Sequence, residues 1–338
     1  MWHVIGIGTV VAITFGTGCS HPANDQRSSP QAQPIVEHGA PSVVSEAELR
    51  EESITFELDI PYAATENPRQ RLDLYRPETP KLDKLPVIVF FHGGHGLLAG
   101  DKSDGTAQLL PLLRTRDYAA VSVAYRLPGE ATWPAPLHDS KAAIRWLRAN
   151  AKHYGIDPDR IAVWGVNAGA HLALMLGVTG DVPELEGEVG PHTGITSEVS
   201  AVVNFFGVVD MLALVDQPSR FDRTRADAPE ALVLGGALPD NPEMAVAASP
   251  ITYVSANDPP VLTLHGTHDD FVAYAQALSL HEALTAVGVP SYLIAVHGAG
   301  HGEVPEQAEE RVGAFFANVL LGRDVEISTA PLHSPAPE

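Results

Sequence analysis

The sequence predicts a doubly wound α/β fold, with a mostly parallel sheet, helices on both faces and a small lid insertion. Short continuous apolar runs are the first observation, because strands buried on both faces have this pattern. The second is that helical patterns separate these runs, so strands and helices alternate. The third is size, since 338 residues with 45% hydrophobic and 19% charged residues suffice for one large globular domain.

The elements follow in order along the chain. Six apolar runs are predicted strands, at residues 87–91, 119–123, 161–164, 202–206, 261–264 and 292–296. Apolar stripes predict three of the helices, formed by Ala143, Leu147, Ala151 and Tyr154, by Ala277, Leu280, Leu284 and Val287, and by Val312, Phe316 and Val319. Gly155 and Gly322 follow the first and third stripes, where glycine commonly ends a helix.

The two ends of the chain lack these patterns. Residues 4–15 are an apolar run too short to span a membrane, and small residues precede Cys19, which predicts an export signal over residues 1–19. Lipidation of Cys19 and simple cleavage are both open. Polar segments predict a disordered linker at 20–48 and a disordered tail at 323–338. We expect an exported protein that is periplasmic, a membrane-anchored lipoprotein or secreted, with one domain at 49–322.

Charge and cysteine content restrict the partners. The formal net charge is −21, which repels phosphate backbones and excludes nucleic acid as an expected partner. Cys19 is the single cysteine, so no intramolecular disulfide can form.

Chemistry is expected where the predicted strands end, because ligands in such sheets bind at the carboxyl ends of the strands. The glycine-rich segment 92–96 follows the first apolar run, and glycines there let backbone N–H groups approach a developing oxyanion. The third run leads into Gly165, Asn167 and Gly169. This glycine spacing is typical of a nucleophile elbow, a sharp strand-to-helix turn that exposes its central residue.

Two more strand ends carry an acid and a histidine. Asp269 and Asp270 follow the fifth run, and His301 lies in a glycine-rich loop before the last helix. The chain order is therefore elbow, acid, histidine, which is the order of the α/β-hydrolase fold.

Further segments resemble one family within that fold. They are residues 124–127 (AYRL), 133–136 (WPAP), 138–147 (HDSKAAIRWL), 154–158 (YGIDP) and 248–255 (ASPITYVS). Together with the segments around Asp269 and His301, they make the chain similar to secreted carboxylesterases related to bacterial feruloyl esterases, over roughly residues 50 to 322. The resemblance implies hydrolysis of small-molecule or carbohydrate esters by a Ser-His-Asp triad, without metal or organic cofactor.

Position by position, the resemblance assigns the site. Asp269 matches the triad acid and His301 the base, while Gly94, His95 and Ala168 match the oxyanion donors. Asn167 occupies the position of the serine nucleophile. The chain also departs from the family pattern at Ala170, where a second glycine is usual, and around His95, where the loop is one residue longer.

A carboxamide is a poor nucleophile, so three hypotheses remain for residue 167. The chain is an impaired hydrolase that still binds ester or carbohydrate ligands and can act as a binding protein. Alternatively, hydrolysis survives through water activated by His301, or through slow deamidation of Asn167 to aspartate. The third is a working esterase that carries a Ser-to-Asn substitution.

Other features are given structural interpretations. His265, His268, Asp269 and Asp270 are neighbours in one loop and are not expected to converge on a metal ion. His171 is interpreted as a packed residue. Arg220, Arg223 and Arg225 are interpreted as a solvated face of an insertion at about 208–248, which we expect to form the lid. A peptidase of this fold is less consistent with the chain, because no second domain is evident.

Overall fold

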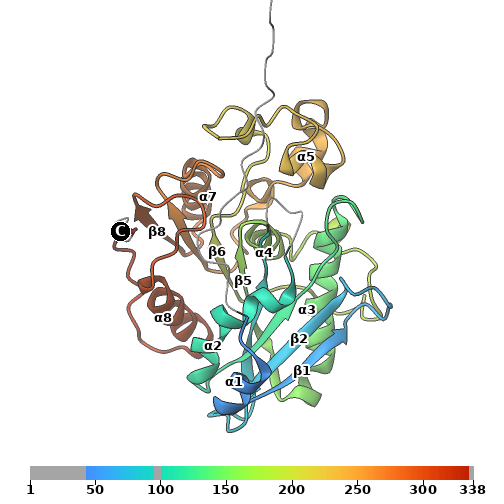
Figure 1. The fold of residues 1–338 in the computed structure, drawn as a ribbon, viewed down its shortest axis with the longest axis vertical. Helices are drawn as coiled ribbons and strands as arrows, with labels where there is room; N and C mark the ends of the chain where they lie inside the picture. The colour runs from blue at the N-terminus through green and yellow to red at the C-terminus, as the bar shows by residue number, and fades with distance from the viewer. Residues whose placement is uncertain (1–42, 95–99, 335–338) are drawn as a thin grey trace, which may run out of the picture. The chain divides into compact units, whose positions relative to one another are not determined.

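One sheet of nine strands organises the residues that the computed structural model describes, 43–94 and 100–334 (Figure 1). Its order is β1-β2-β4-β3-β5-β6-β7-β8-β9. The strands are β1 (Ile54–Pro61), β2 (Arg71–Pro77), β3 (Leu85–Phe91), β4 (Ala119–Val123), β5 (Ile156–Val166), β6 (Ala201–Phe205), β7 (Val261–Gly266), β8 (Ser291–His297) and β9 (Leu332–His333). The pairs β1-β2 and β2-β4 are antiparallel and the other pairs are parallel, which confirms the predicted mostly parallel sheet.

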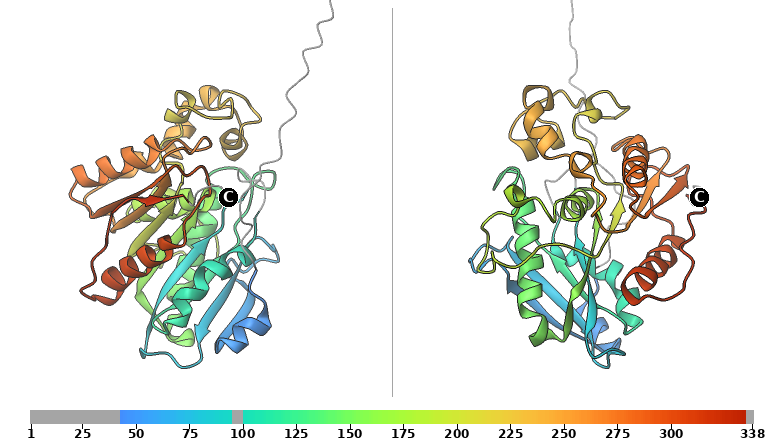
Figure 2. Two further views of the ribbon diagram at one scale, coloured as in Figure 1. Left: turned by 60° about the vertical axis from the view of Figure 1, so that its left-hand side comes forward. Right: turned by 180° about the vertical axis from the view of Figure 1, so that it is seen from behind.

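Helices cover both faces of this sheet. They are α1 (Glu46–Glu51), α2 (Thr106–Arg114), α3 (Ala135–Tyr154), α4 (Ala168–Val178), α5 (Pro229–Leu234), α6 (Pro242–Ala247), α7 (Ala275–Ala286) and α8 (Gln307–Leu321). Buried residues of α3, α4 and α7 belong to one apolar cluster, and those of α1, α2 and α8 belong to another. The right panel of Figure 2 shows α3 and α8 on opposite sides of the strands.

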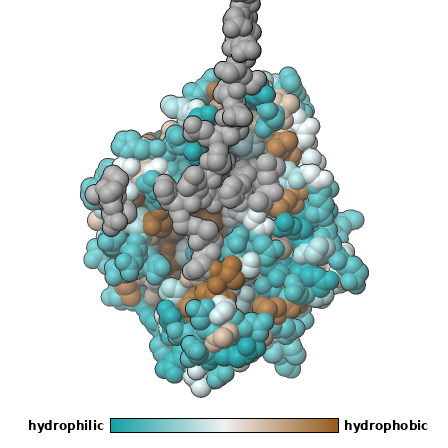
Figure 3. Space-filling view, in the orientation of Figure 1, coloured by the Kyte–Doolittle hydropathy of each residue, from teal (hydrophilic) through white to brown (hydrophobic). Residues whose placement is uncertain are grey.

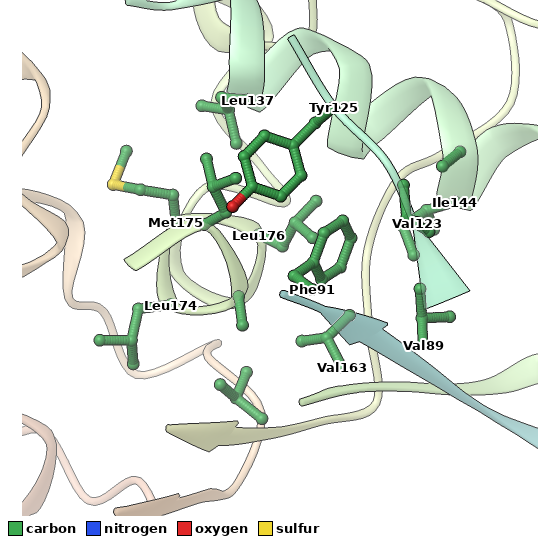
Figure 4. Packing of buried hydrophobic residues seen from close by; sticks show 14 of the residues in the cluster. Val89, Phe91, Val123, Tyr125, Leu137, Ile144, Val163, Leu174, Met175 and Leu176 are labelled. Carbon is green, nitrogen blue, oxygen red and sulfur yellow. The ribbon is translucent and has the colours of Figure 1, made fainter. Parts of the chain in front are cut away.

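Strand β3 shows why the central runs are apolar throughout. Val87, Val89 and Phe91 pack in the cluster under α3 and α4, while Ile88 and Phe90 pack in the cluster on the other face. Side chains alternate between the faces of a strand, so a strand buried on both faces needs apolar residues at every position. Figure 4 shows part of the first cluster, with Phe91 beside Val89 and Val163.

The helix ends predicted from glycine are confirmed. Gly155 and Gly322 follow α3 and α8 in the left-handed conformation, with φ of 61° and 63°, respectively. Glycine adopts this conformation without strain, and its N–H then closes the last turn. The stripe of α7 is confirmed only in part, because Ala277, Leu280 and Leu284 are buried whereas Val287 is 38% exposed.

The described domain is longer than the predicted 49–322. Helix α1 begins at Glu46, because Ser45 and Glu48 form reciprocal side-chain-to-backbone hydrogen bonds that cap it. At the other end, Leu332 pairs with Val296, so the predicted disordered tail contributes β9 to the sheet. Both boundaries are therefore corrected. Two residues form β9 and six form α1, and elements this short give no periodic signal in a sequence.

Several expectations concern residues without a structural description. The export signal at 1–19, Cys19, the linker up to residue 42, His95 and the last four residues all lie outside the described ranges. Within those ranges, no helix is both long enough and apolar enough to span a membrane.

The insertion lies beyond the strand ends. It connects β6 to β7 and contains α5 and α6. Figures 1 and 2 show it in yellow and orange at one end of the domain. On the face shown in Figure 3, hydrophilic residues predominate and the apolar ones form small separate areas. The position of the insertion beyond the strand ends lets it cover the edge of the sheet where ligands are expected.

Candidate active site

Asn167 occupies the turn between β5 and α4. Its φ of 51° and ψ of −114° are unusual for a residue with a side chain and match the strained turn of a nucleophile elbow. The turn is tight: a Cβ atom at Gly165 would overlap the backbone of Gly169, and one at Gly169 would overlap the carbonyl oxygens of Phe91 and His92. Only glycine fits at both positions, which explains the motif.

The side chain of Asn167 has two partners. Its Oδ1 accepts a hydrogen bond from the backbone N–H of Ala168 at 2.6 Å. Its Nδ2 contacts Nε2 of His301. Because the oxygen is committed to an N–H donor, the amide nitrogen must face the histidine, where it can only donate. His301 therefore accepts through Nε2 and carries its proton on Nδ1.

Asp269 holds His301 in that tautomer. Its Oδ2 accepts from Nδ1 of His301 at 2.8 Å, and its Oδ1 accepts from the backbone N–H groups of Phe271 and Val272, each at 2.8 Å. His265 lies 3.3 Å from the same Oδ2. Burial alone would raise the pKa of Asp269, but hydrogen bonds from His265 and His301 hold it well below its usual range. The carboxylate of Asp269 is thus ionised, and two histidines and two backbone N–H groups hold it in place.

Two aromatic rings enclose His301. Phe271 stacks on its imidazole with ring centroids 4.6 Å apart, and Phe206 meets it edge-on at 4.8 Å. Only 5% of the His301 side chain is exposed. The rings restrict both rotation of the imidazole and access of water. The hydrogen bond between His301 and Asp269, the catalytic dyad, is stronger as a result.

The oxyanion side of the site is described only in part. A Cβ atom at Gly93 would lie 3.2 Å from Cβ of Asn167, so the glycine-rich loop packs directly against the elbow. Gly94 has a φ of 148°, which favours glycine. The Ala168 N–H is at the elbow, as predicted, but Oδ1 of Asn167 already occupies it. His95 is outside the described residues, and the oxyanion roles of Gly94 and His95 stay predictions.

A pocket with an empty volume of about 310 Å³, part of it open to solvent, begins at Asn167. Its lining combines the elbow, the acid loop and the insertion: Asn167, Ala168, His171, Val208, Met211, Pro229, Glu230 and Phe271. The insertion contributes four of these residues, from Val208 to Glu230. It therefore forms part of the pocket wall, and its role as a lid stays a prediction.

The arginine cluster in the insertion is only partly the solvated face that we predicted, because Arg220 and Arg225 are exposed whereas Arg223 is buried. Arg223 is 2% exposed, pairs with Glu230, donates to the carbonyl oxygen of Phe271 and lies 5.1 Å from its ring. Arg220 is partly exposed and pairs with Asp270 at 3.6 Å, whereas Arg225 is well exposed. Phe271 was not predicted from the sequence as a residue of the site. Its position two residues after Asp269 was the sequence feature that could have indicated a place beside the triad acid.

The remaining histidines agree with their structural interpretation. His171 is buried against Trp133, and its Nε2 donates to the carbonyl oxygen of Ala248 at 2.6 Å. Burial lowers the pKa of His171 to about 4, so it is neutral. His268 is exposed and Asp270 pairs with Arg220, so they do not converge with His265 and Asp269 on one point. In the described ranges, no group of three His, Cys, Asp or Glu residues could hold a metal ion.

Comparisons with known proteins identify the family of the chain. A family model described as BD-FAE matches residues 72–284. Esterase LipC of Mycobacterium tuberculosis (strain ATCC 25618 / H37Rv) is 34% identical over 70% of this chain, and esterase LipQ of the same strain is 33% identical over 68%. The matches span 58% and 53% of those two proteins, so the chain spans little more than half the length of these curated relatives.

A solved structure extends the likeness to three dimensions. The truncated form of a carbohydrate esterase from gut microbiota superposes with a TM-score of 0.74 at 31% identity, covering 80% of this chain and 98% of that one. The sequence-based expectation of an α/β-hydrolase fold of the esterase type is confirmed by these matches. The chain belongs to the BD-FAE family of α/β-hydrolase esterases.

Proposed function

We propose that this protein binds small or acylated-carbohydrate carboxylic esters at the Asn167 pocket and hydrolyses them slowly or not at all. Membership of an esterase family supports carboxylic esters as the ligand class. The structural likeness to a carbohydrate esterase supports an acylated carbohydrate within that class.

The contact between Asn167 and its two partners carries the proposal. A serine at this position would donate its hydroxyl to Nε2 of His301, and an acyl oxygen would accept from Ala168 N–H. The carboxamide of Asn167 makes both contacts itself. It therefore supplies no nucleophile and also competes with the substrate for an oxyanion donor, two effects that both reduce turnover.

The retained pair of Asp269 and His301 argues that the base of the catalytic machinery is intact. Asp269 and His301 keep the geometry and tautomer of a general base. The loss of a triad nucleophile costs about 10⁶-fold in turnover, and residual rates come from the oxyanion hole and binding. With Ala168 N–H occupied, even that residual rate is expected to be small.

Initial rates of short-chain aryl-ester hydrolysis test the proposal, with the native chain, Asn167→Ser and Asn167→Ala side by side. We expect Asn167→Ser to be at least about 10³-fold faster than the native chain, since the serine regains the prepared base. Asn167→Ala is the matched control, because it frees Ala168 N–H without adding a hydroxyl, and it should recover no more than the residual rate of the oxyanion hole, far below the rate of Asn167→Ser. Intact-mass measurement checks that residue 167 is not deamidated to aspartate.

Two results would contradict the proposal. Native turnover equal to that of Asn167→Ser means that the enzyme works without a serine, through water activated by His301 or through deamidation. No turnover by either chain, together with no ester binding by calorimetry, removes the ester ligand class itself. Binding without turnover in both chains favours the alternative, a binding protein whose pocket no longer supports chemistry.

Export and lipidation at Cys19 remain proposals from residues 1–19.

A further inference from the structure

Glu230 is a buried acidic residue that lines the Asn167 pocket. It lies at the start of α5 in the insertion and is 2% exposed. Its Oε1 pairs with Arg223, which is buried to the same extent. Its Oε2 has no hydrogen-bond partner. Buried carboxylate oxygens are almost always paired, so the free Oε2 calls for an explanation.

The surroundings restrict the partner that Oε2 could accept. Val208, Met211, Pro229 and Phe271 make the neighbouring wall of the pocket apolar. Arg223 neutralises the charge of Glu230, so the pair attracts a neutral donor, with no excess charge to favour a cation or an anion. A hydroxyl group on an otherwise apolar ligand meets these conditions, since it donates one hydrogen bond and carries no charge.

The Arg223–Glu230 pair is also anchored to the catalytic loop. Arg223 donates to the carbonyl oxygen of Phe271, whose ring stacks on His301 and whose N–H binds Asp269. The carboxylate is thereby fixed relative to the dyad, in the same pocket as Asn167. A ligand group at Glu230 is held at a defined position relative to the reacting ester, which is what a specificity-determining contact requires.

We propose that Glu230 is a specificity-determining residue whose Oε2 accepts a hydrogen bond from a hydroxyl group of the ester ligand. This inference rests on the proposed function and names the polar group that its ligand carries. Oε2 is covered in the ligand-free pocket. A turn of the carboxylate about its Cγ–Cδ bond, which is a soft torsion, moves both oxygens together, so the proposal requires a turn small enough to leave Oε1 within hydrogen-bond distance of Arg223. The hydroxyl belongs to either the acyl or the alcohol part of the ester.

Calorimetric titration of the native chain with two matched ligand series tests this. The acyl series comprises the methyl esters of hydroxyphenylpropanoic, methoxyphenylpropanoic and phenylpropanoic acids. The alcohol series comprises a monoacetylated methyl glucoside and its fully O-methylated counterpart. We expect the hydroxyl member of one series to bind about tenfold or more tightly than its methyl ether, because only the hydroxyl can donate to a charged acceptor. The responding series identifies the part of the ester that is read.

Glu230→Gln is the informative variant. Its amide oxygen can keep Arg223, and its NH₂ group then donates equally well to a hydroxyl and to an ether oxygen. The preference for the hydroxyl ligand should therefore fall to within about threefold. Glu243→Gln, an exposed position at the start of α6 in the same insertion, is the control and should keep the native preference.

The outcomes separate this inference from the proposed function. Equal affinities for hydroxyl, ether and unsubstituted ligands in both series overturn the role of Glu230 and leave ester binding intact. A hydroxyl preference that persists in Glu230→Gln overturns it as well. Absence of binding by every ligand overturns both proposals. If Glu230→Gln does not fold, the native ligand series still decides, because it compares donors without any substitution.

Discussion

Nδ2 of Asn167 donates to Nε2 of His301, at the place where a serine hydroxyl would donate in a working triad. The histidine consequently keeps the tautomer of a general base, with its Nδ1 proton on Asp269. The asparagine preserves the electrostatic arrangement around the base while removing the group on which the base would act. A single substitution at residue 167 is therefore expected to separate an inert site from an active one.

Asp269→Asn, made in the Asn167→Ser background, should lower kcat by about 10³- to 10⁴-fold. The backbone N–H groups of Phe271 and Val272 would hold the amide oxygen, leaving the NH₂ group towards His301. His301 would then carry its proton on Nε2 and could not accept one from Ser at residue 167. Aryl-ester kinetics measures the loss. A decrease of less than tenfold would mean that the dyad does not act as the base.

Gly169→Ala should destabilise the fold, because its Cβ atom would overlap the carbonyl oxygens of Phe91, the last residue of β3, and of the buried His92 that follows it. We expect a loss of about 1–3 kcal/mol or more in the free energy of unfolding. Gly313→Ala in α8 is the matched control, since no atom outside the neighbouring backbone of α8 lies within 4 Å of its added Cβ. It should gain about 0.5–1 kcal/mol from helix propensity. Urea denaturation compares the two, and equal effects would refute the crowding argument.

Arg223→Met should lower the free energy of unfolding by about 3–5 kcal/mol, because it leaves Glu230 buried without its partner. Arg225→Met, at an exposed position two residues away, should change it by less than about 0.5 kcal/mol. The double variant Arg223→Met/Glu230→Met should recover most of the loss, since no unpaired charge remains. A mild effect of Arg223→Met alone would show that the ion pair is not buried in solution.

His171 should make the protein lose stability in mild acid. Burial depresses its folded-state pKa from 6.5 to about 4, so its contribution is complete above pH 6.5 and decreases as the pH falls towards 4. Between neutrality and about pH 5, the loss attributable to His171 is about 2 kcal/mol. His171→Gln, whose amide can still donate to Ala248, should remove that part.

The comparison between native and His171→Gln chains isolates this residue. Burial also lowers the pKa values of His92 and His138, so they contribute with the same sign in both chains and cancel. Asp269 acts in a lower window, because its depressed pKa affects stability only as the pH falls below about 3.8. Identical pH profiles for the two chains would refute the assignment to His171.

The central strands and the order of the site residues could be predicted because their signals are local. The apolar run of β3 and the glycines that flank Asn167 each report a constraint imposed within a few residues. Strand β1 gave no such signal. Only Ile54 and Ile60 of it are buried, its register shifts between Glu57 and Ile60, and most of its side chains face solvent.

The environment of Arg223 could not be predicted for a different reason. Its carbonyl partner, Phe271, is 48 residues away, and Glu230 belongs to a helix of six residues. Long-range pairing of this kind depends on how the insertion folds over the strand ends, and no periodicity encodes it. The occupied Ala168 N–H was equally hidden, because it depends on the rotamer of Asn167.

The positive φ of Asn167 has a consequence for how sequences of this kind change over time. A residue with a side chain pays about 1–3 kcal/mol for such a conformation, whereas glycine adopts it freely. Drift under selection for stability alone would therefore replace asparagine by glycine at this turn. Asparagine retained at this turn against that tendency would indicate that the carboxamide itself is used, through its contacts with His301 and Ala168.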